Sequence, residues 1–143
     1  MSVSVVLPVL IYSVKHLAMT YKCIKNARMY TKIPFELIIV ESGSQYFIDS
    51  ADIYVHEKVP STSEIAHNIG FKIAVQKNFI VLLTNDIYVS NNWLEVLMDT
   101  FSHSADCGLA TLGTSLKGHV QNDLIEEGNW FDVAMIRREV FEK

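Results

Sequence analysis

The stretch FIVLLTND, residues 79–86, decides the fold class. Its first five residues are all apolar and have the length of one strand, which is typical of a central parallel strand covered on both faces. Its last three residues, Thr84, Asn85 and Asp86, are polar. The chain then continues through the extended sequence IYV at 87–89 instead of turning back. These features predict a buried strand with a polar tip, in a sheet that binds ligands beyond its carboxyl edge.

Strands and helices alternate on both sides of this stretch. The other predicted strands are residues 2–7, 35–40, 53–55, 109–112 and 130–136. The first predicted helix is 13–30, and the capping-box spacing of Ser61 to Glu64 opens a second. Asn92 with Glu95 caps a third, and a short helix begins at Arg137. This order favours right-handed crossovers. We therefore predict a GT-A-like (Rossmann-like) α/β fold with a mostly parallel sheet and helices on both faces, in a single domain spanning residues 1–143.

The second predicted helix carries two stripes of residues. Ile65, Ile69 and Ile73 form an apolar stripe, and a ladder of small residues, Ala66, Gly70 and Ala74, runs beside it. Small side chains allow a helix backbone to lie close to a sheet. The ladder therefore predicts the face that meets the strands.

Composition limits the classes of partner. Half of the 143 residues are apolar, a fifth are charged and the net charge is −4, so the chain is folded and offers no general attraction for nucleic acid or an anionic membrane. No apolar run approaches the roughly 20 residues of a membrane span, and the run at 5–11 lacks the flanks of a signal peptide. Cys23 and Cys107 lack metal-ligand spacing, and reduced thiols fit a cytoplasmic location.

Three predicted strands end in groups that could meet a ligand. The first ends at Pro8 and Val9, the second at ESGS (41–44), and the central one at TND (84–86). In a parallel sheet all three ends line one crevice. Taken alone, Glu41 is more often a solvated or capping carboxylate, and Asn85-Asp86 is also compatible with the start of a turn.

Asp86 has the strongest physical case for chemistry. A carboxylate at the tip of a central strand can hold Mg²⁺ or Mn²⁺ while diphosphate oxygens fill other positions of the ion. The ion then stabilises charge on a departing nucleoside diphosphate. An acidic chain that binds a diphosphate needs such local chemistry, from a metal ion, backbone amides or single basic residues.

Six segments taken in order resemble the family 2 glycosyltransferases of the GT-A fold. They are the first strand with Pro8, VESGS (40–44), NIG (68–70), LLTND (82–86), NWLE (92–95) and MIRREVFEK (135–143). The resemblance covers nearly the whole chain. It implies the transfer of a sugar from a nucleoside diphosphate sugar, such as a UDP-sugar, to an acceptor hydroxyl with inversion of configuration.

The resemblance also implies roles for single residues. Glu41 falls on the acidic position that contacts the nucleoside, with Ser42 beside it, and Pro8 and Val9 contribute through their backbone. Asn68 lies in the helix that borders the nucleotide pocket. The triplet TND occupies the Asp-x-Asp position, which makes Asn85 a nucleotide-binding residue and Asp86 the ligand of Mn²⁺ or Mg²⁺.

The sequence departs from the family pattern in several places. Thr84 replaces the first acidic residue of the triplet, Glu41 is one methylene longer than the usual Asp, and bulky Phe131 stands where relatives have small residues. Relatives continue beyond the position of Lys143 into the segment that carries the catalytic base, and we expect this chain to lack that segment. Glu127 and Asp132 are then the candidate bases, unless a partner subunit supplies one.

Two further readings stay open. The chain could be an inactive nucleotide-sugar-binding module or one part of a split glycosyltransferase, and a shortened domain with an open flank favours a homo-oligomer. An unrelated doubly wound nucleotide-binding domain is disfavoured because no Gly-rich loop follows the first strand. The five histidines show no metal-ligand spacing, and each fits a surface or core position better than a catalytic one.

Overall fold

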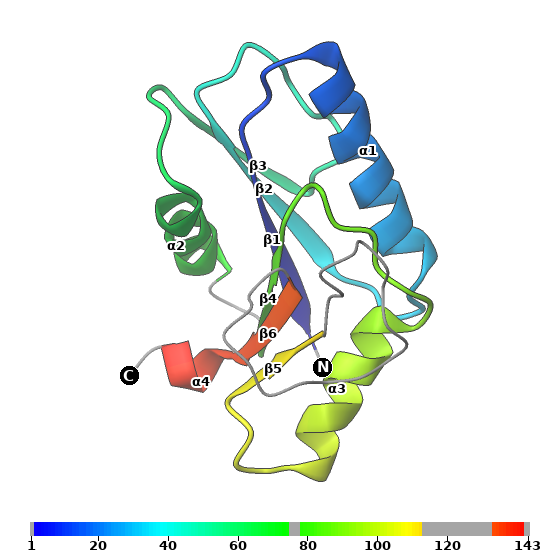
Figure 1. Cartoon of the computed structure of the whole chain (residues 1–143). Helices are drawn as coiled ribbons and strands as arrows, with labels where there is room; N and C mark the ends of the chain where they lie inside the picture. Colours follow the sequence, from blue (N-terminus) through cyan, green and yellow to red (C-terminus); the bar gives the residue numbers. More distant parts are fainter. Residues whose placement is uncertain (1, 75–77, 113–132, 142–143) are drawn as a thin grey trace.

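The computed structural model describes residues 2–74, 78–112 and 133–141, which form one six-stranded sheet with helices packed against it (Figure 1). The strands are β1 (Val3–Val9), β2 (Glu36–Ser42), β3 (Ile53–Glu57), β4 (Phe79–Leu83), β5 (Leu109–Thr111) and β6 (Val133–Arg137). Their order across the sheet is β3-β2-β1-β4-β6-β5. The apolar run at 79–83 is thus a central strand, as predicted.

The first four strands are parallel to one another. β1 pairs with β2 and β4, β2 pairs with β3, and all three pairings are parallel. β6 is antiparallel to both β4 and β5. The prediction of a mostly parallel α/β sheet is confirmed. The carboxyl ends of β1, β2 and β4 therefore meet at one edge.

Helices cover both faces of the sheet, as predicted. α1 (Val14–Met29) and α3 (Trp93–His103) lie over one face, and α2 (Ser63–Ile73) lies over the other; the short α4 (Arg138–Phe141) follows β6 (Figure 1). Alternate residues of each strand serve the two faces, because side chains point to opposite sides of a sheet. In β2, Leu37 and Ile39 join the core under α1 and α3, whereas Ile38 and Val40 join the core under α2.

The ladder of small residues on α2 meets the sheet. Ala66, Gly70 and Ala74 are all buried. A Cβ atom at Gly70 would lie 2.2 Å from Cγ1 of Val6, so no side chain fits between this turn of α2 and β1. By contrast, Ile65 from the predicted apolar stripe is 51% exposed. The close approach fixes how far the first turn of α2 stands from the strand ends.

The predicted cap of α2 lies one residue too early, and that of α3 is at the predicted residue without the expected side-chain bond. The cap of α2 is Thr62, whose hydroxyl accepts a hydrogen bond from the backbone of Ile65, and not Ser61, because Ser61 bonds to Ser42 and Glu57 instead. Asn92 precedes α3 in the left-handed conformation (φ 58°) and makes no side-chain cap bond.

Glu95 does not close a capping box with Asn92 either. Its carboxylate accepts hydrogen bonds from the backbone N–H of Lys32 and the hydroxyl of Thr31. These bonds join the start of α3 to the segment that follows α1. Burial by itself raises the pKa of Glu95, but the hydrogen bonds outweigh burial, so the pKa of Glu95 is lowered.

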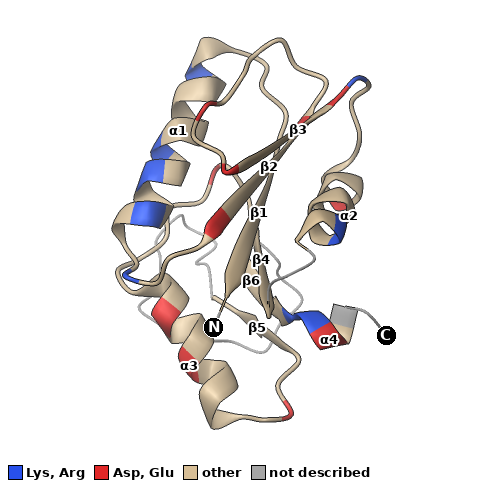
Figure 2. Cartoon of the chain, turned by 180° about the vertical axis from the view of Figure 1, so that it is seen from behind, with Lys and Arg blue, Asp and Glu red and all other residues tan. Residues whose placement is uncertain are grey.

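The basic residues of α1 face outward, along the helix seen in Figure 2. They are Lys15, Lys22, Lys25 and Arg28, all exposed.

Within the described residues, no helix is both long enough and apolar enough to cross a bilayer. Cys23 is buried, Cys107 is half-buried, and both are free thiols.

Candidate functional site

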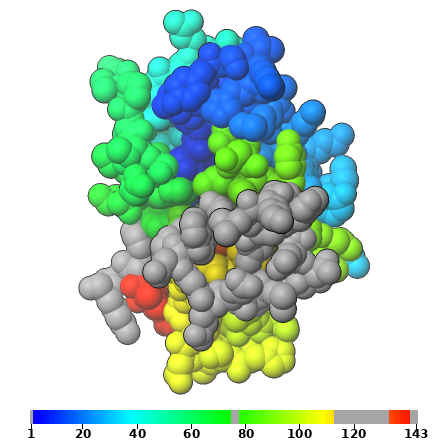
Figure 3. Space-filling view, in the orientation of Figure 1, coloured from blue at the N-terminus to red at the C-terminus, as the bar shows by residue number. Residues whose placement is uncertain are grey.

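A cavity of about 340 Å³ opens at the carboxyl ends of β1, β2 and β4. Three strand ends and the first turns of α1 and α2 enclose it. The lining residues are Pro8, Val9, Leu10, Tyr12, His16, Ser42, Ser61, Thr62, Ser63, Ala66, Thr84, Asn85 and Asp86. In Figure 3, α2 lies on one side of this region in green, and the blue N-terminal residues and the lime segment after β4 lie on the other.

The described lining contains one charged side chain. Asp86 is its only carboxylate, and no Lys or Arg is among these residues. The start of α2 contributes Ser61, Thr62 and Ser63 to the wall. A helix N-terminus favours anions because its first N–H groups lack partners in the helix. The neighbouring Glu64 reflects this, since its own backbone N–H and the Thr62 hydroxyl lower the pKa of its carboxyl.

The β4 end of the cavity has a polar side chain that is exposed and another whose oxygen is buried without a described partner. Asp86 is exposed, and Oγ1 of Thr84 is buried without a hydrogen-bond partner among the described residues. The thiol of Cys23 lies behind this strand end and donates to the carbonyl of Thr84 at 3.4 Å. Burial, with a smaller contribution from the charge of Asp86, raises the pKa of Cys23 to about 12. This edge therefore rests on dry packing and presents the carboxylate of Asp86 to the cavity, while the Thr84 hydroxyl oxygen stays buried.

The amide of Asn85 is held by α1. Its Nδ2 donates to Oγ1 of Thr20 at 2.9 Å and approaches Nε2 of His16 at 3.3 Å. The Thr20 hydroxyl in turn donates to the backbone carbonyl of His16 at 3.0 Å. The ring of His16 stacks on that of Tyr12, with centroids 5.6 Å apart and planes 12° apart. Nδ1 of His16 is buried and has no partner among the described residues.

The loop that follows Asp86 is also fastened to α1. The side chain of Asn26 accepts from the backbone N–H of Val89 at 2.6 Å and donates to its carbonyl at 3.3 Å. The indole N–H of buried Trp93 donates to the carbonyl of Ala27 at 2.9 Å. The part of this segment from Val89 to the start of α3 is thus fixed to α1.

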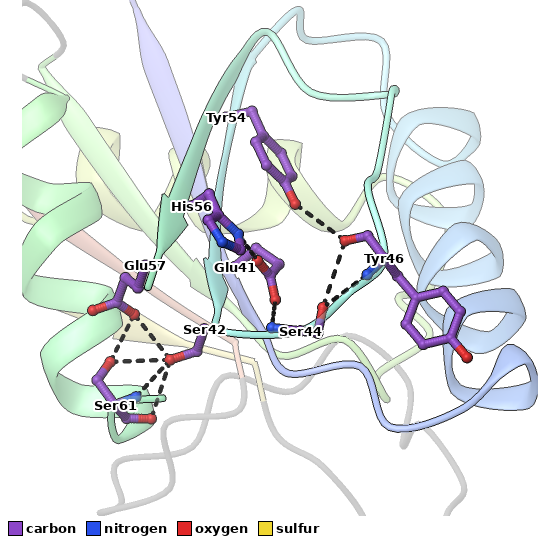
Figure 4. Close-up of polar contacts among 8 residues, drawn as sticks. All are labelled: Glu41, Ser42, Ser44, Tyr46, Tyr54, His56, Glu57 and Ser61. Atoms are coloured by element: carbon purple, nitrogen blue, oxygen red, sulfur yellow. Dashed lines mark hydrogen bonds and ion pairs between the residues drawn. The ribbon is translucent and has the colours of Figure 1, made fainter. Parts of the chain in front are cut away.

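The β2 end carries a polar cluster that satisfies itself (Figure 4). Ser42 is 3% exposed; its hydroxyl accepts from the backbone N–H of Ser61 at 2.7 Å and donates to the carboxylate of Glu57 at 2.9 Å. The hydroxyl of Ser61 also donates to Glu57, at 2.7 Å. The cluster joins β2, β3 and the residue before the cap of α2. Its bonds set the position of that cavity wall.

Glu41 points away from the cavity. Its side chain is fully buried, and its two oxygens accept from the backbone N–H of Ser44 and pair with Nδ1 of His56 on β3 (Figure 4). The bond to Ser44 closes the turn at Gly43, which has a φ of 72° and lies against Pro60. Burial, followed by the charge of Glu41, raises the pKa of nearby Tyr54 to about 12.

The structure brings together five of the predicted site residues at the cavity: Pro8, Val9, Ser42, Asn85 and Asp86. Glu41 lies behind the wall, and Asn68 is exposed on α2 outside the lining. Glu127 and Asp132 lie outside the described residues. No group of three or more His, Cys, Asp or Glu side chains in the described chain is arranged to hold a metal ion by itself.

Sequence reasoning missed Tyr12, His16 and the Ser61–Ser63 segment. The spacing of Ser61–Ser63 predicts only a helix cap, although helix starts at the carboxyl edge of a sheet regularly face ligands. The spacing of the histidines indicates no metal site and so does not single out His16. Its position one turn into α1, directly after the strand with Pro8, was the available indication.

Comparisons with known proteins identify the fold. No family model matches the sequence, and no curated protein matches it. Among solved structures, the mannosyltransferase PcManGT from Pyrobaculum calidifontis, in complex with GDP-Man and Mn²⁺, is similar over 98% of this chain, with a TM-score of 0.72 and 15% identity. S. aureus TarS 1-349 is similar over 99%, with a TM-score of 0.68 and 10% identity.

A CMP:2-keto-3-deoxy-manno-octonic acid synthetase complexed with CTP is also similar, over 99% of this chain, with a TM-score of 0.64 and 10% identity. The chain spans 45% of the PcManGT chain, 48% of the TarS 1-349 chain and 76% of the synthetase chain. These likenesses show that the chain has the fold of GT-A-type glycosyltransferases, which nucleotide-handling synthetases share.

Proposed function

We propose that the chain binds a nucleoside diphosphate sugar in this cavity and transfers the sugar to an acceptor hydroxyl with inversion, assisted by Mn²⁺ or Mg²⁺. The observation that carries the proposal is the cavity itself. Three parallel strand ends and the start of α2 enclose it, and Asp86 is the one charged side chain in its described lining. The fold likeness to a mannosyltransferase in complex with GDP-Man and Mn²⁺ supports the choice of ligand.

The charge of the lining favours a metal-bound diphosphate. A diphosphate beside the exposed carboxylate of Asp86, with no Lys or Arg among the described lining residues, requires a cation between the two. Mg²⁺ is often bound through one or two carboxylates together with substrate phosphates, so one carboxylate suffices when the ligand supplies the other oxygens. Such an ion would stabilise charge on the departing nucleoside diphosphate. The N–H groups at the start of α2 would hold the remaining phosphate oxygens.

The nucleoside would lie along the ends of β1 and β2. Pro8, Val9 and Leu10 offer backbone groups and apolar surface there, and Ser42 lines the adjoining wall. Glu41 is fully buried and occupied by Ser44 and His56, so we assign it an indirect role, in which it fixes the Gly43 turn. Asn68 remains a proposed nucleotide contact only for a ligand that extends beyond the described lining.

Inverting transfer requires a base that deprotonates the acceptor hydroxyl. We propose Asp132 or Glu127 for this role, or a carboxylate from a partner subunit. The alternative, a binding module or one part of a split glycosyltransferase, shares the same donor site and lacks turnover. Binding and turnover are therefore separate questions, and each requires its own measurement.

Calorimetric titration tests the donor site. UDP, GDP and CTP would be titrated with and without Mn²⁺ into the wild-type chain and Asp86→Ala. We expect metal-dependent binding of UDP or GDP that weakens at least about tenfold in Asp86→Ala. Asp106→Ala is the matched control, because Asp106 is an exposed Asp outside the cavity lining. Failure of every nucleotide to bind would refute the proposal, and preference for CTP would point to nucleotidyl transfer.

Turnover separates the enzyme from the module. Release of UDP or GDP from the corresponding sugar nucleotides would be followed with and without a panel of acceptor sugars, for wild type, Asp132→Asn and Glu127→Gln. An enzyme releases the nucleotide, and its product has the opposite anomeric configuration by NMR. A chain that binds donor and releases no nucleotide is the module.

A further inference from the structure

We infer that Thr20 and His16 are positioning residues for Asn85, and that they turn its amide oxygen toward the ligand, so that the β4 end of the cavity recognises a hydroxyl group of the donor. The nature of the donor rests on the proposed function. The orientation of Asn85 rests on contacts between α1 and the end of β4 that do not involve the ligand.

Both hydrogens of the Asn85 amide are used by α1. One is donated to Oγ1 of Thr20 at 2.9 Å, and the other points to Nε2 of His16 at 3.3 Å. The Thr20 hydroxyl gives its own hydrogen to the carbonyl of His16, so it can only accept from Asn85. The amide oxygen has no hydrogen bond within the described residues and is the atom left for the cavity that Asn85 lines.

The same contacts fix the form of the His16 ring. A neutral imidazole has one donor and one acceptor nitrogen. Because Nε2 faces an N–H of Asn85, it is the acceptor, and the proton resides on Nδ1. Nδ1 is the buried atom without a partner in the described chain. The network from Thr20 to His16 to Asn85 therefore has one consistent arrangement of hydrogens.

The chemistry of this edge follows from that arrangement. The Asn85 oxygen is an acceptor, so it favours a ligand group that donates, while the neighbouring Asp86 carboxylate is the residue proposed to hold the cation. Phosphate oxygens only accept, whereas ribose and sugar hydroxyls donate. Thr20 is fully buried and does not line the cavity, so it acts only through Asn85.

NMR tests the orientation without any ligand. In the ¹⁵N-labelled chain, the Asn85 side-chain amide, assigned by its disappearance in Asn85→Ala, is expected to show slow exchange and contacts to the Thr20 methyl group. The His16 ring is expected to be the neutral tautomer protonated at Nδ1. Exposed Asn91 serves as the reference for a freely solvated amide. An Asn85 amide that behaves like that of Asn91 would overturn the inference.

Binding tests the consequence. We expect Thr20→Val to bind the donor about tenfold more weakly than wild type does, which is the loss expected when one hydrogen bond to a ligand is removed. Thr20→Ser, which keeps the hydroxyl, should restore affinity to within about twofold. Analogues that lack single ribose or sugar hydroxyls identify the group, because the analogue without it binds wild type and Thr20→Val equally.

Other outcomes contradict the inference. Wild-type affinity in Asn85→Ala would show that Asn85 does not touch the donor. A loss in Asn85→Ala with none in Thr20→Val would show that Asn85 needs no positioning. Thr20→Val could also weaken the binding of every analogue by the same factor, and only when Mn²⁺ is present. That result would show that the Asn85 oxygen contacts the cation and not a hydroxyl. If no donor binds the wild-type chain, the proposed function fails and the hydroxyl assignment falls with it, while NMR still decides the orientation.

Discussion

The cavity has two polar edges, at the ends of β2 and β4, and they use their polar groups differently. At β2, the carboxylates of Glu41 and Glu57 are both bonded within the chain, and Ser42 is buried between strands. At β4, Asp86 is exposed and the Thr84 hydroxyl is buried without a described partner. Buried polar groups are normally satisfied. The β2 edge therefore maintains the structure, whereas the β4 edge exposes the carboxylate of Asp86 to the cavity.

The largest expected effect is on the β2 edge. Glu41→Ala removes the acceptor of the Ser44 N–H and the partner of His56 inside the fold. We expect the free energy of unfolding to fall by about 3 kcal/mol, because the fully buried side chain leaves a void and the Ser44 N–H loses its acceptor, whereas the half-exposed His56 ring can bond to water. Urea denaturation measures the change.

Glu41→Gln is the control for that substitution. It keeps the size and one acceptor oxygen, so it should lose clearly less stability than Glu41→Ala. A change below about 0.5 kcal/mol in Glu41→Ala would mean that the β2 edge does not depend on this carboxylate, and the contrast between the two edges would disappear.

The second effect concerns the dry packing behind the β4 edge. The pKa of Cys23 is raised by burial from 9.0 to about 12. The unfolded chain thus ionises this thiol at a lower pH than the folded chain. Stability is unaffected by this thiol below about pH 9 and should fall as the pH rises above 9, by up to about 1.4 kcal/mol between pH 9 and pH 10.

Comparison with Cys23→Ala isolates this contribution, because other groups that titrate above pH 9 are common to both chains. Thermal unfolding at a series of pH values gives the difference. Parallel slopes for the two chains would show that water reaches the Cys23 thiol, and that the backing of β4 is not dry.

The smallest effect is a gain in stability. Thr84→Val replaces a hydroxyl whose oxygen is buried without a described partner. We expect the free energy of unfolding to rise by about 1 kcal/mol, since an unsatisfied group is removed. Chemical denaturation measures the change. A loss of stability would show that this hydroxyl already has a partner in the folded chain.

Much of the fold could be predicted from local pattern. The run at 79–83 matches β4 residue for residue, and the small residues of α2 face the sheet as their spacing indicated. The predicted capping bonds failed because Ser61 and Glu95 bond instead to distant partners that no local motif specifies, namely Ser42, Glu57, Thr31 and Lys32.

The site was predictable where it depends on strand ends and not where it depends on side-chain direction. Alternation along β2 places Glu41 on the same face as Leu37 and Ile39, and Ser42 on the face toward α2. That rule would have separated the two residues. By contrast, the contact of His16 with Asn85 spans 69 positions of sequence and depends on how α1 packs on the sheet. Tertiary packing alone determines it.

The close approach of α2 to β1 also sets the size of what the cavity can admit. Gly70 leaves no room for a methyl group beside Val6, so the first turn of α2, with Ser61–Ser63, cannot be moved without a change at this contact. Substituting Gly70 by Ala would push the helix outward, and a smaller residue at position 6 would let it return. We therefore expect this pair of positions to widen or narrow the cavity, although neither residue is in its described lining.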